Sequence, residues 1–115
     1  MTLRTMPNER PDVGMSERHR LRLDLPGCCP VSGNPRPGST LTLSYRPGET
    51  VLEVFSLHAY VESFIGGRGE VRSMEAMIQT ITAEAAKALG VPVVGIADLV
   101  LFPSQEMRLV CRARP

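Results

Sequence analysis

The sequence of 115 residues has no tryptophan and few aromatic rings, with three phenylalanines and two tyrosines. Its core must therefore be built from aliphatic side chains and methionine, and 43% of the residues are hydrophobic, so such a core is available. The length fits a single domain. Because a chain this short buries a modest share of its surface, we expect it to associate with further copies of itself.

The chain also lacks an excess of charge of either sign, with 13 basic and 12 acidic residues. Nucleic-acid binding normally shows as a basic excess, so we expect no direct nucleic-acid partner. The longest apolar run, residues 91–102, is interrupted by Asp98 and falls short of the roughly 20 residues that span a bilayer. We therefore expect a soluble protein with no membrane partner.

An N-terminal leader and a disulfide framework are missing from the pattern as well. Residues 1–17 contain no apolar core of the length that a signal peptide needs. They are polar and contain prolines, so we expect a flexible N-terminal tail over 1–17 and a single domain over 18–115. Three cysteines, two of them adjacent, suggest no disulfide pairing and favour a reduced, cytoplasmic setting.

The remaining sequence shows two kinds of periodicity. Strict alternation predicts strands over 20–25 and 40–45, and apolar runs predict strands over 91–102 and 107–113. Between the two strand pairs, apolar residues at helical spacing predict two helices. The stripe of the first is Leu57, Tyr60, Val61 and Phe64, and the second has Ser73 as its N-cap and Gly90 just beyond its end. The order ββααββ predicts an α+β fold, an antiparallel sheet with both helices on one face.

Three segments carry a family likeness. Residues 29–35 spell CPVSGNP, residues 44–47 spell SYRP, and residues 53–64 contain Glu, Ser-Leu, Tyr and Ser-Phe in order. They resemble the CPxTGxP, S-Y-x-P and E-S-K-S-L-K-L-Y-x-x-S-F motifs of the NADPH-dependent nitrile reductases of queuosine biosynthesis (QueF type). Those enzymes belong to the tunnelling-fold superfamily, and the likeness covers roughly residues 19–100.

The resemblance implies a tunnelling fold, in which small subunits form an oligomeric β-barrel with helices outside and ligand pockets between neighbouring chains. It implies Cys29 as the nucleophile that adds to the nitrile of 7-cyano-7-deazaguanine. NADPH then reduces the resulting thioimide in two hydride steps to 7-aminomethyl-7-deazaguanine, a step of tRNA modification. The implied partners are this small heterocyclic substrate and further copies of the chain.

At two positions that contact the substrate in the family, this chain has a different residue. The family has an acidic proton donor seven residues after the cysteine, where this chain has Arg36. Without gaps, Arg72 takes the place of the glutamate that grips the purine-like base, and Glu70 or Glu75 would replace it after a shift of register. The candidate substrate-binding residues are therefore Glu75, Glu70, Arg72 and Arg36.

The cofactor motif departs too. Glu53, Ser56 and His58 align with it, but Phe55 and His58 replace the lysines that serve the dinucleotide phosphates. Two alternatives to an NADPH-dependent reductase therefore stay open. One is a cofactor-independent relative that transfers ammonia to the nitrile and forms an amidine, and the other is a non-catalytic tunnelling-fold protein that binds a small heterocycle. Glu53 has a second interpretation, because a glutamate before a helix also favours the helix dipole.

The cysteines allow structural interpretations as well. Cys29 is either a small buried thiol at a strand end or the nucleophile. Cys28 alternates to the opposite side in an extended segment, which favours packing, and Cys111 lies within the last predicted strand. With His19 and His58 as the only histidines, fewer than four well-spaced metal ligands are evident, so we expect no metal site.

Overall fold

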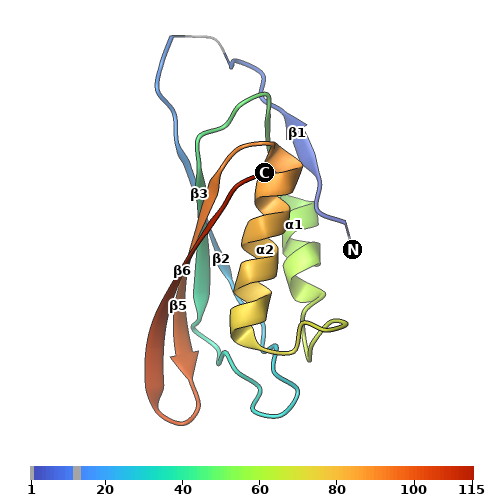
Figure 1. The fold of residues 1–115 in the computed structure, drawn as a ribbon, viewed down its shortest axis with the longest axis vertical. Coiled ribbons are helices and arrows are strands. Elements are labelled where there is room, and N and C mark those ends of the chain that lie inside the picture. Colours follow the sequence, from blue (N-terminus) through green and yellow to red (C-terminus); the bar gives the residue numbers. More distant parts are fainter. Residues whose placement is uncertain (1, 12–13) are drawn as a thin grey trace.

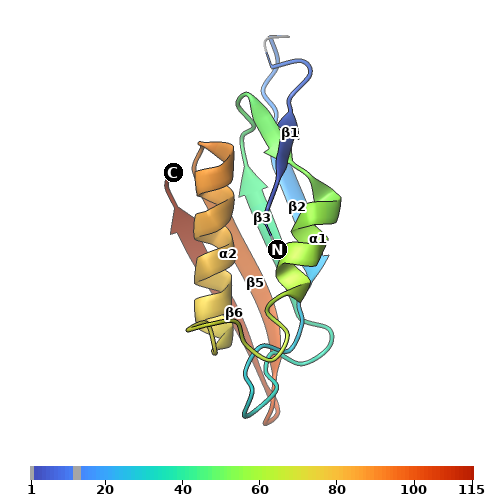
Figure 2. The same cartoon turned by 90° about the vertical axis from the view of Figure 1, so that its right-hand side faces the viewer.

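A computed structural model describes residues 2–11 and 14–115, and its main body is a sheet covered by two helices. The four-stranded sheet is antiparallel with the order β2-β3-β5-β6. Figures 1 and 2 show α1 and α2 side by side on one face of this sheet. The bounds are β2 His19–Asp24, β3 Thr40–Tyr45, α1 Val54–Glu62, α2 Met74–Leu89, β5 Val93–Leu101 and β6 Gln105–Ala113. The predicted α+β class with two helices and an antiparallel sheet is confirmed.

Helix α2 begins and ends where the sequence predicts. The Ser73 hydroxyl accepts the backbone N–H of Ala76 at 3.1 Å, which satisfies one of the free donors of the first turn. Gly90 ends the helix with φ of 69°, a left-handed conformation that favours glycine. The helix packs directly on β5 at Gly95, where a side chain would overlap Thr82.

The core lies between the helices and the sheet and contains all four residues of the stripe predicted for the first helix. Its largest fully buried side chains include Tyr45 from β3 and Phe64, which follows α1. Aliphatic residues and methionine supply most of the rest, as the scarcity of rings requires. Fully buried members are Tyr45, Phe64, Leu41, Leu43, Met77, Ile78, Ile81, Val61 and Val93.

A second, two-stranded sheet differs from the sequence-based expectation. Residues 1–17 were expected to be a loose tail, yet Thr5–Pro7 form β1, which pairs with β4 (Thr50–Leu52). Asn8 then holds the chain through a side-chain hydrogen bond to the Gly48 carbonyl at 2.9 Å. Positions 1 and 12–13 of the expected tail lie outside the described residues. Strands of three residues are too short to show alternation, so sequence periodicity could not find them.

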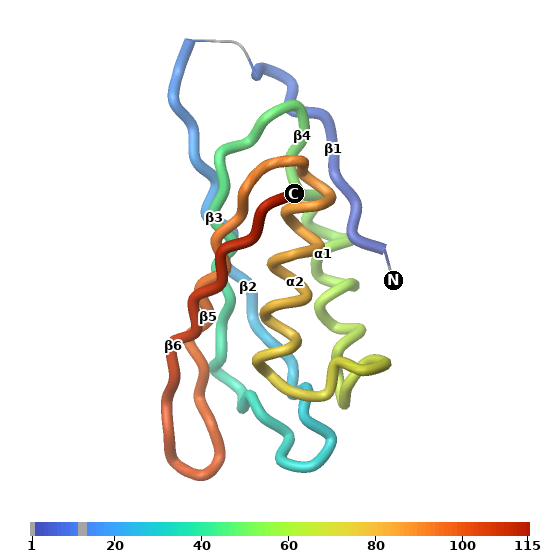
Figure 3. Tube along the Cα trace, viewed as in Figure 1, coloured from blue at the N-terminus to red at the C-terminus, as the bar shows by residue number. Residues whose placement is uncertain are grey.

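Three connections meet at one end of the molecule. Figure 3 shows the β2–β3 loop, the α1–α2 connection and the β5–β6 turn together at that end. The N–H of Gly66 donates to the Gly27 carbonyl at 3.0 Å, which joins the first two connections. Among the described residues, no helix is long and apolar enough to cross a bilayer.

Candidate functional site

The cysteine loop, residues 27–36, forms a closed backbone structure between β2 and β3. The Asn34 carbonyl accepts the N–H groups of both Cys28 and Cys29 at 2.9 Å. The N–H of Gly33 donates to the Cys29 carbonyl at 2.8 Å. Because these bonds link both ends of the segment, the turn that carries Cys29 has a defined shape.

Cys29 is half-exposed, and its sulfur faces the donors of its own turn. The N–H of Ser32 donates to Cys29 Sγ at 3.4 Å. Hydrogen bonds from the Ser32 side chain and backbone, helped by the N–H groups of Val31 and Gly33, lower the pKa of Cys29 from 9.0 to about 7. About half of this thiol is therefore thiolate at neutral pH, and the thiolate is the nucleophilic form.

The neighbouring Cys28 has the opposite environment. Its side chain is 0% exposed, and its thiol faces the carbonyls of Val71 and Ser73 at 3.9 and 3.7 Å. Burial raises the pKa of Cys28, and the nearby charge of Cys29 adds to that effect. The packing role expected for Cys28 is confirmed. Cys111 is half-buried in β6, packs against the core and also has a pKa raised by burial.

The cysteine loop is fastened to the β5–β6 hairpin chiefly by Asn34, a residue that the sequence analysis did not single out. The Asn34 side chain donates to the Phe102 carbonyl at 2.9 Å and accepts the Phe102 N–H at 2.8 Å. The N–H of Arg36 donates to the Val100 carbonyl at 2.8 Å. Asparagine in a Gly-Asn-Pro turn was a visible signal, but its partner lies 68 positions away and no local pattern shows it.

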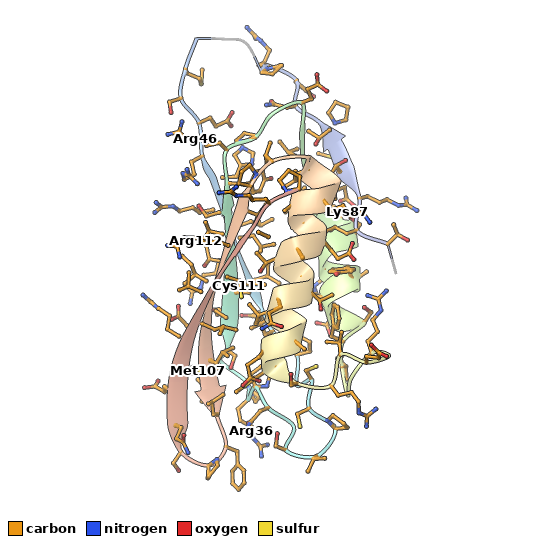
Figure 4. All side chains as sticks on the ribbon, viewed as in Figure 1. Arg36, Arg46, Lys87, Met107, Cys111 and Arg112 are labelled. Atoms are coloured by element: carbon orange, nitrogen blue, oxygen red, sulfur yellow. The ribbon has the colours of Figure 1, made fainter. Side chains whose placement is uncertain are left out.

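The structure places Arg36 and Arg72 around the same end as Cys29. The Arg36 guanidinium lies 5.0 Å from the centre of the exposed Phe102 ring. Figure 4 labels Arg36 at this end of the molecule. The Arg72 side chain and the Cys28 carbonyl both border Gly67 in the α1–α2 connection. Both arginines are exposed, which leaves them free to contact a ligand.

The candidate carboxylates of this end do not reach the thiol. Glu70 is exposed in the turn that Arg68 and Val71 close with reciprocal backbone hydrogen bonds of 2.8 and 2.9 Å. Glu75 is exposed in the first turn of α2. Within the described residues, no carboxylate makes a hydrogen bond or an ion pair with Cys29. The cysteine loop thus presents a half-exposed thiol at an end of the molecule that also carries Arg36 and Arg72.

Two of the candidate cofactor residues, Glu53 and Ser56, lie at the other end of α1, where Glu53 caps the helix. The Glu53 carboxylate accepts the N–H groups of Phe55 and Ser56 at 2.7 and 2.8 Å. These bonds lower the pKa of Glu53. The Ser56 hydroxyl accepts the Arg4 N–H at 2.9 Å and so fastens the segment before β1. The interpretation of Glu53 as a helix-stabilising residue is confirmed.

These positions offer little to the phosphates of NADPH. Glu53 is negatively charged and would repel them, while Ser56 is engaged within the chain. Phe55 is 83% exposed and cannot bind an anion. His58 is exposed and lines a groove of about 480 Å³ between α1 and the edge strand β2. Of the three candidate cofactor residues, Glu53 and Ser56 are thus engaged within the chain, and His58 is exposed at this groove.

No group of three or more metal-ligating side chains is found within residues 2–11 and 14–115. No protein-family model matches the chain, and no curated protein matches it. The cysteine loop is the feature on which a functional proposal rests.

Proposed function

We propose that this chain is an enzyme in which Cys29 adds to the nitrile carbon of 7-cyano-7-deazaguanine. The observation that carries this proposal is the half-exposed Cys29 thiol, whose pKa its own turn lowers to about 7. A nitrile carbon is a weak electrophile and needs a strong, accessible nucleophile, which a thiolate provides. The resemblance of residues 29–35 to a nitrile-attacking loop supplies the substrate.

The addition follows from the side chains around the loop. The thiolate forms the Sγ–C bond while one π bond of the nitrile opens, and the nitrile nitrogen takes up a proton to give a thioimide. An arginine keeps its proton at all ordinary pH values, so Arg36 cannot supply it and water is the source. Arg36 and Arg72 instead act as hydrogen-bond donors to the substrate, at the positions where the family has carboxylates.

The thioimide has two proposed fates. NADPH-dependent reduction to 7-aminomethyl-7-deazaguanine is the one that the resemblance implies. Attack by ammonia, with release of the thiol and formation of an amidine, is a second candidate that needs no cofactor. The engagement of Glu53 as the cap of α1, and of the Ser56 hydroxyl with the Arg4 backbone, favours this second route. Oxidation of NADPH on addition of the nitrile would reject it in favour of the reductase.

The assembly is proposed to be that of the tunnelling fold. The sheet order β2-β3-β5-β6 with both helices on one face supports it. In the part of the chain that the structure describes, β2 and β6 each have one free edge, which a neighbouring copy would pair to close a barrel. Native mass spectrometry tests this, and a purely monomeric protein at tens of micromolar would contradict it.

The covalent step is tested by incubation with 7-cyano-7-deazaguanine and measurement of the intact mass. We expect one added nitrile molecule in the native protein and in Cys111→Ala, which removes a half-buried thiol away from the loop. We expect none in Cys29→Ala. An adduct that persists in Cys29→Ala would overturn the covalent role. Saturable binding without an adduct would favour the non-catalytic, heterocycle-binding alternative, whose anchors would be Arg36 and Arg72.

A further inference from the structure

The four-stranded sheet has one face that points away from the helices, which we call the open face. Figures 1 and 2 show both helices on the other face, and no element of the described chain covers this one. The strand register places side chains of the open face in rows that cross all four strands. The first row is Arg20, Ser44, Val94 and Arg112, and the second is Arg22, Thr42, Ile96 and Val110.

Arginines gather in these two rows and beside them. Arg20 and Arg22 lie on the edge strand β2, Arg112 lies on the edge strand β6, and all three are exposed. The exposed Arg18 guanidinium donates to Ser44 Oγ at 3.2 Å, which places it over the first row. Figure 4 labels Arg112 on the left of the sheet, with both helices on its right. The open face therefore presents guanidinium groups along both of its edges.

The carboxylates of the open face lie further toward the β5–β6 turn. They are Asp24, Asp98 and Glu106. Asp98 accepts a hydrogen bond from Arg108 at 2.7 Å, and Glu17, which precedes β2, pairs with His19 at 2.9 Å. The two rows with arginines contain no carboxylate. The overall charge balance, from which we expected no nucleic-acid partner, thus hides a segregation of charge that only the strand register shows.

An apolar strip separates the two cationic edges. It consists of Val94 and Ile96, which are half-buried, and Val110, which is 44% exposed. Arg20 and Arg112 are three strand spacings apart, about 14 Å between their Cα atoms. The open face thus offers an accessible apolar surface with a cation on each side of it.

We propose that the open face binds a single-stranded nucleic acid through its phosphates, without reading its sequence. The planar guanidinium binds phosphate oxygens in pairs, and all the cations of these rows are arginines. The base faces of a single strand are free to cover the apolar strip, whereas a duplex keeps them stacked inside. An acidic polypeptide has charge of the same sign but no flat apolar group for the strip. The two rows contain no aromatic side chain, so we expect little preference between bases.

This binding goes beyond the proposed reaction at Cys29 and does not depend on it. Arg20 and Arg112 lie near the start of β2 and the end of β6, whereas the cysteine loop follows the end of β2. In the proposed barrel the open face would line the inside, and neighbouring copies would extend the same cationic rows. The experiments therefore use the full chain in its native assembly.

Fluorescence anisotropy with a fluorescein-labelled oligouridylate of about 20 nucleotides tests the binding. Each arginine–phosphate contact should contribute about 0.7 to the slope of log affinity against log salt, so four contacts give about a 50-fold loss between about 50 and 200 mM NaCl. An RNA duplex of the same length and poly-L-glutamate should each compete at least about fivefold more weakly. No saturation by about 100 µM protein in the lower salt, salt-independent binding, or equal competition by either competitor would overturn the proposal.

Glutamine variants separate the open face from surface charge in general. Arg20→Gln with Arg112→Gln removes one cation from each edge, so oligouridylate affinity should fall at least about tenfold and the salt slope by about 1.4. Arg68→Gln is the matched control, because it removes an exposed arginine from the helix side and should bind like wild type. The urea midpoints should stay unchanged, since all three side chains are exposed. Wild-type affinity in the double variant, or an equal loss in Arg68→Gln, would refute a site on the open face.

A cysteine variant keeps this proposal separate from the proposed reaction. Cys29→Ala should bind oligouridylate as the native protein does, while the double arginine variant should still form the nitrile adduct. Failure of one proposal would therefore leave the other standing. Loss of oligouridylate binding in Cys29→Ala would place the nucleic acid at the cysteine loop and so contradict the open face as its site.

Discussion

The cysteine loop and the amino-terminal end of α1 use the same local device with different results. In each, a side chain with ionisable atoms accepts backbone N–H groups from residues two or three positions later. At Cys29 the Ser32 side chain, together with these backbone bonds, brings the pKa from 9.0 to about 7, so about half of the thiol is charged at neutral pH. At Glu53 they lower the pKa of a group that is already ionised. The same hydrogen bonds therefore activate a thiol but only anchor a carboxylate.

The two sites also differ in what remains free. Cys29 Sγ stays half-exposed, and the Ser32 N–H donates to it at 3.4 Å. Both oxygens of Glu53 are engaged by the helix, and the Glu53 N–H donates to the Arg4 carbonyl at 3.0 Å. A side chain saturated by its own backbone has little left for a ligand. The two side chains therefore differ in whether their polar atoms remain free to contact a ligand, and this difference matters more than the residue type.

The largest expected effect is on alkylation of Cys29. At pH 7 a pKa of about 7 gives roughly 50 times more thiolate than a pKa of 9.0. The lower basicity costs nucleophilicity by about eightfold for this shift. We therefore expect iodoacetamide to label Cys29 about six times faster than a reference thiol of pKa 9.0, with half of the maximal rate near pH 7. Rapid-quench labelling followed by peptide mass analysis measures this rate.

The other cysteines are the controls for that experiment. Cys28 and Cys111 have raised pKa values and lower accessibility, so their labelling should be slow throughout this pH range. Cys29→Ala should lose the fast phase completely. A fast phase that survives this substitution, or a rate midpoint near pH 9, would contradict the activated thiol.

A second variant, Gly27→Ala, disrupts the closed backbone of the cysteine loop. A side chain at Gly27 would place its Cβ 2.7 Å from the Gly33 carbonyl oxygen, a backbone atom that cannot move alone. Gly27→Ala should therefore open the turn, destabilise the protein by about 1–3 kcal/mol and return the pKa of Cys29 toward 9. Urea unfolding and the pH profile of labelling measure the two effects.

The matched control is Val31→Ala in the same loop. Val31 is 94% exposed, so its truncation should change stability by no more than about 0.5 kcal/mol. Unchanged labelling in Gly27→Ala would show that the closed turn is not what activates Cys29.

Ser32→Ala tests the main donor with a smaller effect. The Ser32 side chain is the first cause of the low Cys29 pKa, while the backbone donors of the turn remain in the variant. The pKa should therefore rise only part of the way toward 9, and labelling at pH 7 should fall a few-fold while the rates converge above pH 9. Ser32→Thr keeps a hydroxyl and should restore the wild-type profile. A rate that falls equally at every pH would indicate a steric cause instead.

Much of the fold follows from local signals in the sequence. The Ser73 cap, the Gly90 terminus and the strict alternation in 40–45 depend on residues within one turn or one strand, and each is where the sequence predicts it. The β1–β4 sheet was missed because each strand has three residues and its partner lies about 45 positions away. Pairing of that kind depends on tertiary contacts that no short window contains.

The site was predictable only in part, for the same reason. The sequence singles out Cys29 through its loop and separates it from Cys28 by alternation, and the structure gives the two thiols opposite environments. It could not show that Asn34 fastens the loop to Phe102, or that Arg68 covers the Tyr60 ring. These contacts join different elements, so they become visible only once the elements are packed.

The smallest expected effect concerns Glu53, the cap at the amino-terminal end of α1. The folded-state pKa of Glu53 lies below its ordinary 4.5, so ionised Glu53 stabilises the fold above that pH, and the contribution is lost as the pH falls through the folded-state pKa. Glu53→Gln should therefore lower the urea midpoint modestly at pH 7, and the difference from wild type should shrink toward pH 3. Labelling of Cys29 at pH 7 should be unchanged, because Glu53 lies at the opposite end of α1. A stability difference that is constant from pH 7 to pH 3, or slower labelling of Cys29, would contradict the assignment of Glu53 as a cap that is independent of the cysteine loop.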